Sequence, residues 1–156
     1  MPESSAALFD QHHLAVFRYL LRLLGRRDVA EDLTQEVFVR VVRHQERYTD
    51  CGQPRAWLLR IARNLAIDWQ RARHRTPEGA DVDVPDRAPG PDLDMALRQA
   101  LAALAHDDRE VFLLRTIGGL GHHEIATIVG ATPAAVRCRI HRARARLRQA
   151  LEAPHP

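Results

Sequence analysis

The residues with the clearest capacity to bind a ligand are arginines near the carboxyl end of the chain. Six of the twelve residues from 137 to 148 are arginine. A guanidinium group holds five N–H donors in one plane, and it can pair bidentately with phosphate oxygens or with the acceptor edge of guanine. The basic residues of the whole chain are 23 arginines, with no lysine. This composition favours nucleic acid as the ligand.

Two short helices and the turn between them would have to position these arginines. Ala126, Gly130 and Val136 have the spacing of a helix-turn-helix, in which a small residue lets two helices cross closely, a glycine takes the left-handed turn and an apolar residue docks the second helix. Thr132 and Pro133 predict the start of the second helix. A threonine hydroxyl can accept from a free amide there, and proline loses no hydrogen bond at the first helical position.

The second helix has two distinct faces when its residues are placed at about 100° per residue. Its predicted buried stripe is Val136, Ile140, Ala143 and Leu147. Its predicted outer face is Ala134, Cys138, His141 and Ala145, flanked by Arg137, Arg142 and Arg148. Small outer residues between arginines suit a helix that enters the major groove. A solvated basic helix is the alternative, but the turn, the cap and the stripe agree in register and favour a DNA-reading helix.

Composition and charge indicate an all-α protein made of two small helical domains. The 156 residues are 46% hydrophobic and only 5% aromatic, and strand patterns are nearly absent. Residues 1–75 and 92–156 are both net basic, whereas residues 76–91 contain four prolines, two glycines and four acidic residues. The predicted domains are therefore residues 1–75 and 92–156, and residues 76–91 form an extended acidic linker.

Apolar residues at helical spacing predict three helices in the first domain. The first ends at Gly25, and the second begins at Asp28, with Glu31 completing a variant of the capping box. Turn-forming residues predict a loop over residues 48–54, and a long helix follows from Pro54. The core stripe predicted for this last helix is Trp57 or Leu58, then Ile61, Ala62, Leu65 and Trp69. In the second domain, helices over about residues 92–104 and 106–117 precede the helix-turn-helix.

Several classes of function are disfavoured by what the chain contains. Cys51 and Cys138 are too few for a disulfide framework or a zinc site. The letters HHE at 122–124 hint at a zinc-protease motif, but Thr127 occupies the place of the second histidine. No nucleophile–base pair or glycine-rich phosphate loop is visible, so we expect no enzyme activity, no cofactor and no metal. Signal-peptide and membrane-spanning patterns are also missing, which predicts a cytoplasmic location without membrane insertion.

Four segments of the chain resemble the extracytoplasmic-function sigma factors, the smallest class of the sigma-70 family of bacterial RNA polymerase subunits. They are AEDLTQEVFVRV (30–41), RAWLLRIARNLAIDW (55–69), REVFLLRTIGGLGHHEIATIVG (109–130) and ATPAAVRCRIHRARARLR (131–148). The resemblance implies that residues 1–75 form a sigma-2 domain and residues 92–156 a sigma-4 domain. It also implies binding to core RNA polymerase, through the beta-prime clamp and the beta flap, and to promoter DNA. A cognate anti-sigma factor is a further expected partner.

The resemblance also assigns roles to individual residues. It implies that an exposed acidic helix face binds the beta-prime clamp, and that face contains Asp32, Gln35 and Glu36. The residues implied in minus-10 recognition are Tyr48, Thr49 and Asp50 of the loop, Asn64, and Arg71 among the arginines that follow it. Those implied in minus-35 recognition are Thr132, Arg137, Cys138, His141 and Arg142. The family usually has serine at the position of Cys138, and a thiol is a weaker donor than a hydroxyl.

The function implied by this resemblance is that of an alternative sigma factor. Such a protein directs core polymerase to a specific set of promoters and assists promoter melting, by binding rather than by chemistry. Two other functions stay open from the sequence. One is a sigma-like regulator that binds polymerase or an anti-sigma factor without initiating transcription, and the other is a stand-alone helix-turn-helix transcription regulator.

Overall fold

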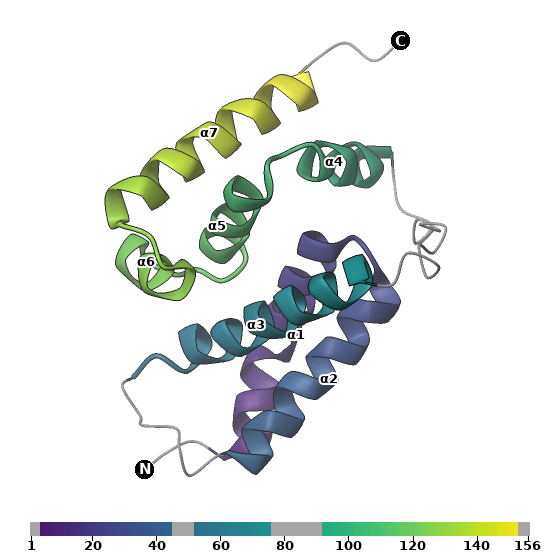
Figure 1. The fold of residues 1–156 in the computed structure, drawn as a ribbon, viewed down its shortest axis with the longest axis vertical. Coiled ribbons are helices and arrows are strands. Elements are labelled where there is room, and N and C mark those ends of the chain that lie inside the picture. Colours follow the sequence, from purple (N-terminus) through teal and green to yellow (C-terminus); the bar gives the residue numbers. More distant parts are fainter. Residues whose placement is uncertain (1–3, 45–51, 76–91, 153–156) are drawn as a thin grey trace. The chain divides into compact units, whose positions relative to one another are not determined.

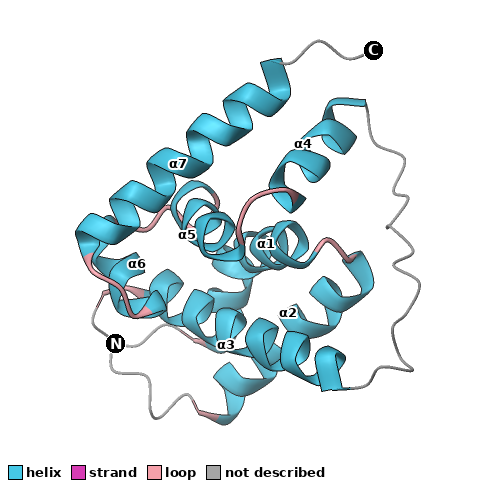
Figure 2. Ribbon diagram, turned by 45° about the horizontal axis from the view of Figure 1, so that its top comes forward, coloured by secondary structure: helices cyan, strands magenta, loops and turns pink. Residues whose placement is uncertain are grey.

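The chain is all-helical wherever its structure is described. The computed structural model describes residues 4–44, 52–75 and 92–152, which form seven α-helices and no strand (Figure 1; Figure 2). The chain divides into two compact units, residues 1–86 and 87–156. The all-α prediction is confirmed. The exact limits of the two domains and the linker at residues 76–91 stay predictions, because the linker lies outside the described residues.

The first unit is a bundle of three helices, each of which packs against the other two. They are α1 (Ser5–Leu24), α2 (Arg27–Arg43) and α3 (Pro54–Arg75). The Ser4 hydroxyl caps α1 by accepting from the Ala7 amide at 3.1 Å. The helix ends at Gly25 as predicted, and this glycine adopts the left-handed conformation. Fully buried side chains from all three helices form the core, among them Val16, Tyr19, Leu20, Val37, Val41, Leu58, Leu59 and Ala62.

The start of α2 differs from its prediction. The helix begins at Arg27, and the preceding residue, Arg26, makes no side-chain capping bond. Asp28 already lies in the first turn, where its carboxylate accepts from Arg26 Nη2 at 3.0 Å and from Arg26 Nε at 3.4 Å. The hydrogen bond from Arg26 lowers the pKa of the Asp28 carboxyl. The predicted capping box of Asp28 and Glu31 is therefore wrong, because Asp28 is inside the helix and its carboxylate is held by Arg26.

The buried face of α3 is rotated from the predicted one. Its buried side chains are Leu58, Leu59, Ala62, Leu65 and Ala66. Trp57, Ile61 and Trp69 are partly exposed instead. The Trp69 ring lies near the guanidinium carbons of Arg26 and Arg73, which are 5.9 Å and 5.3 Å from the ring centroid. Assigning the tryptophans to the core was wrong, since the leucine and alanine side chains fill the space between the three helices.

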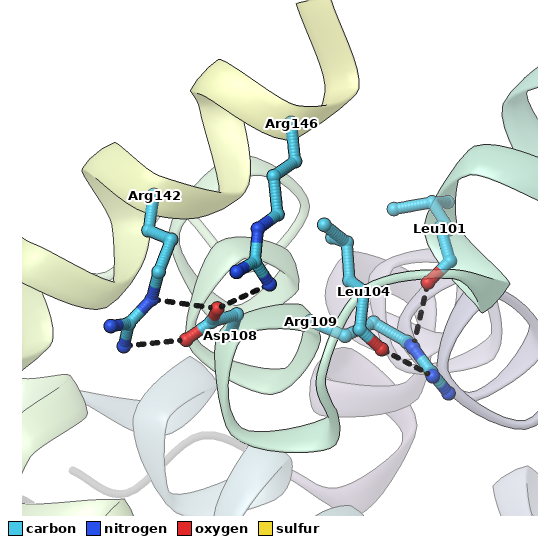
Figure 3. Close-up of polar contacts among 6 residues, drawn as sticks. All are labelled: Leu101, Leu104, Asp108, Arg109, Arg142 and Arg146. Carbon is cyan, nitrogen blue, oxygen red and sulfur yellow. Dashed lines mark hydrogen bonds and ion pairs between the residues drawn. The ribbon is translucent and has the colours of Figure 1, made fainter. Parts of the chain in front are cut away.

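The second unit contains four helices, and the last of them contacts the other three. They are α4 (Asp92–Ala102), α5 (His106–Thr116), α6 (His122–Val129) and α7 (Pro133–Glu152). Arg109 of α5 closes the carboxyl end of α4 by donating to the carbonyl oxygens of Leu101 at 2.9 Å and Leu104 at 3.0 Å (Figure 3). The Leu101 carbonyl also accepts from the Leu104 amide at 3.1 Å, so the guanidinium reinforces the turn that ends α4.

The turn between α6 and α7 has the geometry that the sequence predicts. Gly130 adopts φ 73° and ψ 38°, and its amide donates to the Ala126 carbonyl at 2.9 Å. The Ala131 amide reaches the same carbonyl at 3.1 Å. The Thr132 hydroxyl then accepts from the Ala135 amide at 3.1 Å, so it caps α7 as predicted.

Replacing Gly130 by alanine tests this turn. A Cβ at this position would meet no atom within 4 Å, so the only cost is that of the left-handed backbone. We expect Gly130→Ala to lower the free energy of unfolding by about 1–2 kcal/mol. Gly130→Asn should cost less, because asparagine tolerates this conformation. Urea unfolding followed by circular dichroism measures both variants, and equal stability of Gly130→Ala and the wild type would contradict the account.

Candidate DNA-binding surface

Helix α7 buries one stripe of side chains and exposes the opposite face, as the sequence predicts. Its buried residues are Val136, Ile140, Ala143 and Leu147. Its exposed residues include Ala134, Cys138, His141 and Ala145, together with Arg137, Arg142 and Arg148. The Cys138 thiol is free and exposed. The outer face therefore combines small side chains with arginines, a combination that allows close approach to a duplex.

One flank of α7 is tied to α5 through a buried carboxylate. The side chain of Asp108, in the first turn of α5, is only 3% exposed. Its Oδ2 accepts from Arg142 Nε at 2.9 Å, and its Oδ1 accepts from Arg142 Nη2 at 3.1 Å (Figure 3). Arg146 Nη1 lies 3.8 Å from the same Oδ2. The hydrogen bond that Arg142 donates to Asp108 raises the pKa of the Arg142 guanidinium above its ordinary value.

The other flank of α7 brings arginines of α5 and α7 close to a histidine at the start of α6. His122, the first residue of α6, is partly buried, and this burial lowers the pKa of its imidazole. The positive charges of Arg115, Arg137 and Arg144 lower this pKa further. Arg115 is fixed near the end of α5 because its Nη1 donates to the Leu120 carbonyl at 2.9 Å. The arginines of this flank can attract phosphate groups.

The predicted site residues of the first unit lie on two helices and one loop. On α2, Asp32 and Gln35 are exposed, whereas Glu36 is partly buried and pairs with Arg40 at 3.4 Å. On α3, Asn64 and Arg71 are both exposed. The loop residues Tyr48, Thr49 and Asp50 lie outside the described residues, so their predicted role stays a prediction.

Comparison with known proteins identifies the family. Residues 8–76 match Sigma-70 region 2, and residues 94–147 match Sigma-70, region 4. The chain is 36% identical to the ECF RNA polymerase sigma factor SigL of Mycobacterium tuberculosis, across 94% of this chain and 88% of that protein. The chain belongs to the extracytoplasmic-function class of the sigma-70 family. The family prediction and the predicted general role, that of an alternative sigma factor, are thereby confirmed.

Other relatives of this sigma factor agree with the assignment. It is 39% identical to the ECF RNA polymerase sigma factor SigE of Mycolicibacterium smegmatis, over 92% of this chain, but it spans only 60% of that protein's length. Its fold resembles that of the sigma factor RpoE in complex with the anti-sigma factor NepR from Bartonella quintana, with a TM-score of 0.81 and 26% identity, covering 96% of this chain and 98% of that one. CnrH in complex with the cytosolic domain of CnrY gives a TM-score of 0.72 at 26% identity, covering 97% and 89% of the two chains.

Sequence reasoning missed two features of this sigma factor. Asp108 lies at a helix start, where acidic residues are common, and its pairing with Arg142 across 34 positions carries no local signal. The charge environment of His122 was also missed, although the arginines that create it were all visible.

Among the described residues, none of the helices combines the length and the hydropathy that crossing a bilayer would require.

The lowered pKa of His122 makes a prediction about pH. An imidazole whose pKa is lower in the folded than in the unfolded chain disfavours folding once the unfolded form binds the extra proton. The protonation of His122 therefore costs the folded chain no stability above pH 6.5, the ordinary pKa of histidine. Stability is lost as the pH falls from there through the lower pKa of the folded chain. We expect His122→Gln to make the free energy of unfolding less sensitive to pH between about 7 and 5.

The matched control for this measurement is His141→Gln, since His141 is an exposed histidine of α7 in the same unit and is not among the groups that lower the pKa of His122. Denaturant unfolding at a series of pH values compares the two variants with the wild type. Equal pH slopes in His122→Gln and the wild type would show that the burial and the neighbouring arginines do not act on His122 as described.

Proposed function

We propose that this sigma factor carries core RNA polymerase to promoters with two sequence elements, and that its two units read these elements separately. The second unit reads the minus-35 element as duplex, and the first unit reads the minus-10 element as it opens. The observation that carries the proposal is the outer face of α7, where small side chains lie between arginines directly after a tight turn. This is the geometry by which a helix-turn-helix inserts its second helix into the major groove.

Recognition of the minus-35 element rests on five residues of the α7 region. Arg137 and Arg142 donate to guanine or to phosphate, and the His141 and Cys138 side chains approach base edges. Thr132 has its hydroxyl oxygen engaged by the Ala135 amide, and the hydroxyl hydrogen is left to donate to a phosphate. Positive charge from Arg115 and Arg144, on the flank next to His122, adds affinity without sequence preference.

Recognition of the minus-10 element rests on the exposed side of α3 and on the preceding loop. The Asn64 amide offers both donors and acceptors to an unpaired base, and Arg71 holds the strand through its phosphates. A base that leaves the stacked DNA strand would be received by the loop residues Tyr48, Thr49 and Asp50. Free energy from trapping unpaired bases then drives melting without nucleotide hydrolysis.

Core polymerase and an anti-sigma factor bind surfaces of the protein other than those that bind DNA. The α2 face with Asp32, Gln35 and Glu36 supplies negative charge to the beta-prime clamp, and the region of residues 113–120 meets the beta flap. An anti-sigma factor is a further proposed partner, because similar sigma factors are found in complexes such as RpoE with NepR. Exposed apolar side chains on the first unit, including Phe9 and Val42, offer contact area for such a protein.

In-vitro transcription with core polymerase on a pool of promoter fragments tests the proposed function. The wild-type chain should start transcripts from fragments that share two boxes at fixed spacing. Arg137→Ala should lower initiation from these promoters by about tenfold and weaken base preference only in the minus-35 box. Asn64→Ala should act only on the minus-10 box.

Matched controls come from exposed residues of α1 that have no proposed role. Arg18→Ala removes the same side chain as Arg137→Ala, and Gln11→Ala removes an amide as Asn64→Ala does. Binding of polymerase without any transcripts would favour the sigma-like regulator. Specific duplex binding without polymerase would favour the stand-alone regulator.

Charge reversal on α2 tests the polymerase contact by itself. Asp32→Arg should weaken binding to core polymerase by at least about tenfold, because a positive charge then faces the surface that the carboxylate attracts. Asp10→Arg, an equal charge change at an exposed position of α1, should leave the affinity unchanged. Fluorescence anisotropy of labelled protein titrated with core polymerase gives both constants. Identical effects of the two reversals would mean that only net charge matters.

A further inference from the structure

The pairing of Asp108 with Arg142 joins a buried carboxylate to a half-exposed guanidinium. The Asp108 side chain is 3% exposed, whereas that of Arg142 is 53% exposed. Two of the five N–H donors of Arg142, one on Nε and one on Nη2, are taken by the carboxylate. Of the remaining three, one on Nη1 and one on Nη2 point in parallel from the end edge of the guanidinium, and the second on Nη1 points from its third edge. One edge of this group is therefore fixed inside the protein while the end edge is left for a ligand.

Arg142 belongs to the outer part of α7 rather than to its buried side. It follows Cys138 by four positions, so the two residues lie about 40° apart around the helix axis. His141 is its neighbour toward the centre of the outer face. Both Cys138 and His141 are exposed. The free edge of Arg142 thus borders the surface that the proposed function assigns to the major groove.

We propose that Asp108 is a positioning residue that holds the Arg142 guanidinium end-on toward one guanine of the minus-35 element. This inference rests on the proposed function of α7. Two parallel N–H groups on the free edge match the O6 and N7 acceptors of guanine, which is the bidentate pairing that distinguishes guanine from other bases. An arginine already fixed in one rotamer loses less conformational freedom on binding than a mobile one.

The Asp108 carboxylate acts by fixing the orientation of Arg142, and it does not increase the overall attraction of the protein to DNA. Asp108 places a negative charge near DNA, so it lowers the general affinity for phosphates while it improves the aim of one arginine. Arg146, 3.8 Å from Asp108 Oδ2, offsets part of that charge. A residue that merely braced α5 against α7 would affect every promoter position equally. A positioning residue instead changes the preference at one base.

The test measures base discrimination in the minus-35 box with the full chain bound to core polymerase. Promoters carrying each of the four bases at each position of the box are compared by open-complex formation. Arg142→Ala identifies the position that Arg142 reads, because discrimination is lost there. At that same position Asp108→Asn should lower discrimination by about 3- to 10-fold, while the other positions change by less than about twofold. Binding to duplex without a promoter should be unchanged or stronger.

The matched control is Asp107→Asn, which removes an equal charge from the same helical turn at an exposed position. It should leave discrimination at every position unchanged. Arg142→Lys guards against a folding defect, because lysine keeps a charge for Asp108 but has no bidentate edge. It should keep the circular-dichroism spectrum of the wild-type fold and lose discrimination at the same base.

Several results would overturn the inference. Asp108→Asn could keep full discrimination at the position read by Arg142, or it could weaken all positions equally. Full discrimination in Arg142→Lys would also contradict a bidentate contact. If Arg142→Ala changes no base preference while the wild type initiates normally, Arg142 does not read DNA. In that case the inference fails but the proposed sigma function stands. If the wild-type chain starts no transcripts at all, the proposed function itself has failed.

Discussion

Burial of one apolar stripe on α7 is the constraint on which the rest of the second unit depends. Val136 and Ala143 are completely buried, and Ile140 and Leu147 nearly so. A fully buried valine or isoleucine side chain stabilises a fold by about 1.5–3 kcal/mol relative to an exposed one. Because side chains on a helix are separated by about 100°, fixing these four fixes the direction of every other residue of α7. The arginines are thereby turned outward as two flanking rows, without any interaction of their own being needed.

Two neighbouring residues of α5 then connect α5 to α4 and to α7. Arg109 donates to carbonyls at the end of α4, and Asp108 accepts from Arg142 of α7. A buried carboxylate is costly unless it is paired, so Asp108 requires a guanidinium from α7. The two rows of arginines consequently differ. The row with Arg142 is aimed by a buried acid, whereas the row with Arg137 and Arg144 adds its positive charge to that of Arg115, close to His122.

The sequence predicted best those features that depend on neighbouring residues. The α7 stripe, the left-handed Gly130 and the Thr132 cap follow from periodicity and from the conformational preferences of single residues. Features set by tertiary contacts were not predictable in this way. Trp69 has an apolar ring at helical spacing, yet it lies partly exposed near arginines. The partner of Asp108 is 34 residues away, and no pattern in the sequence connects them.

The most direct test of the account asks whether the outer face of α7 lies in the major groove of the minus-35 element. Cys138 is a native thiol on that face, and in a Cys51→Ser variant it is the only cysteine of the chain. Polymerase carrying this variant would be bound to promoter duplexes with a disulfide-tethered base at successive positions. We expect cross-links only at adjacent bases of the minus-35 box, on its major-groove side. Cross-links that spread evenly along the duplex, or that form only outside this box, would contradict the account.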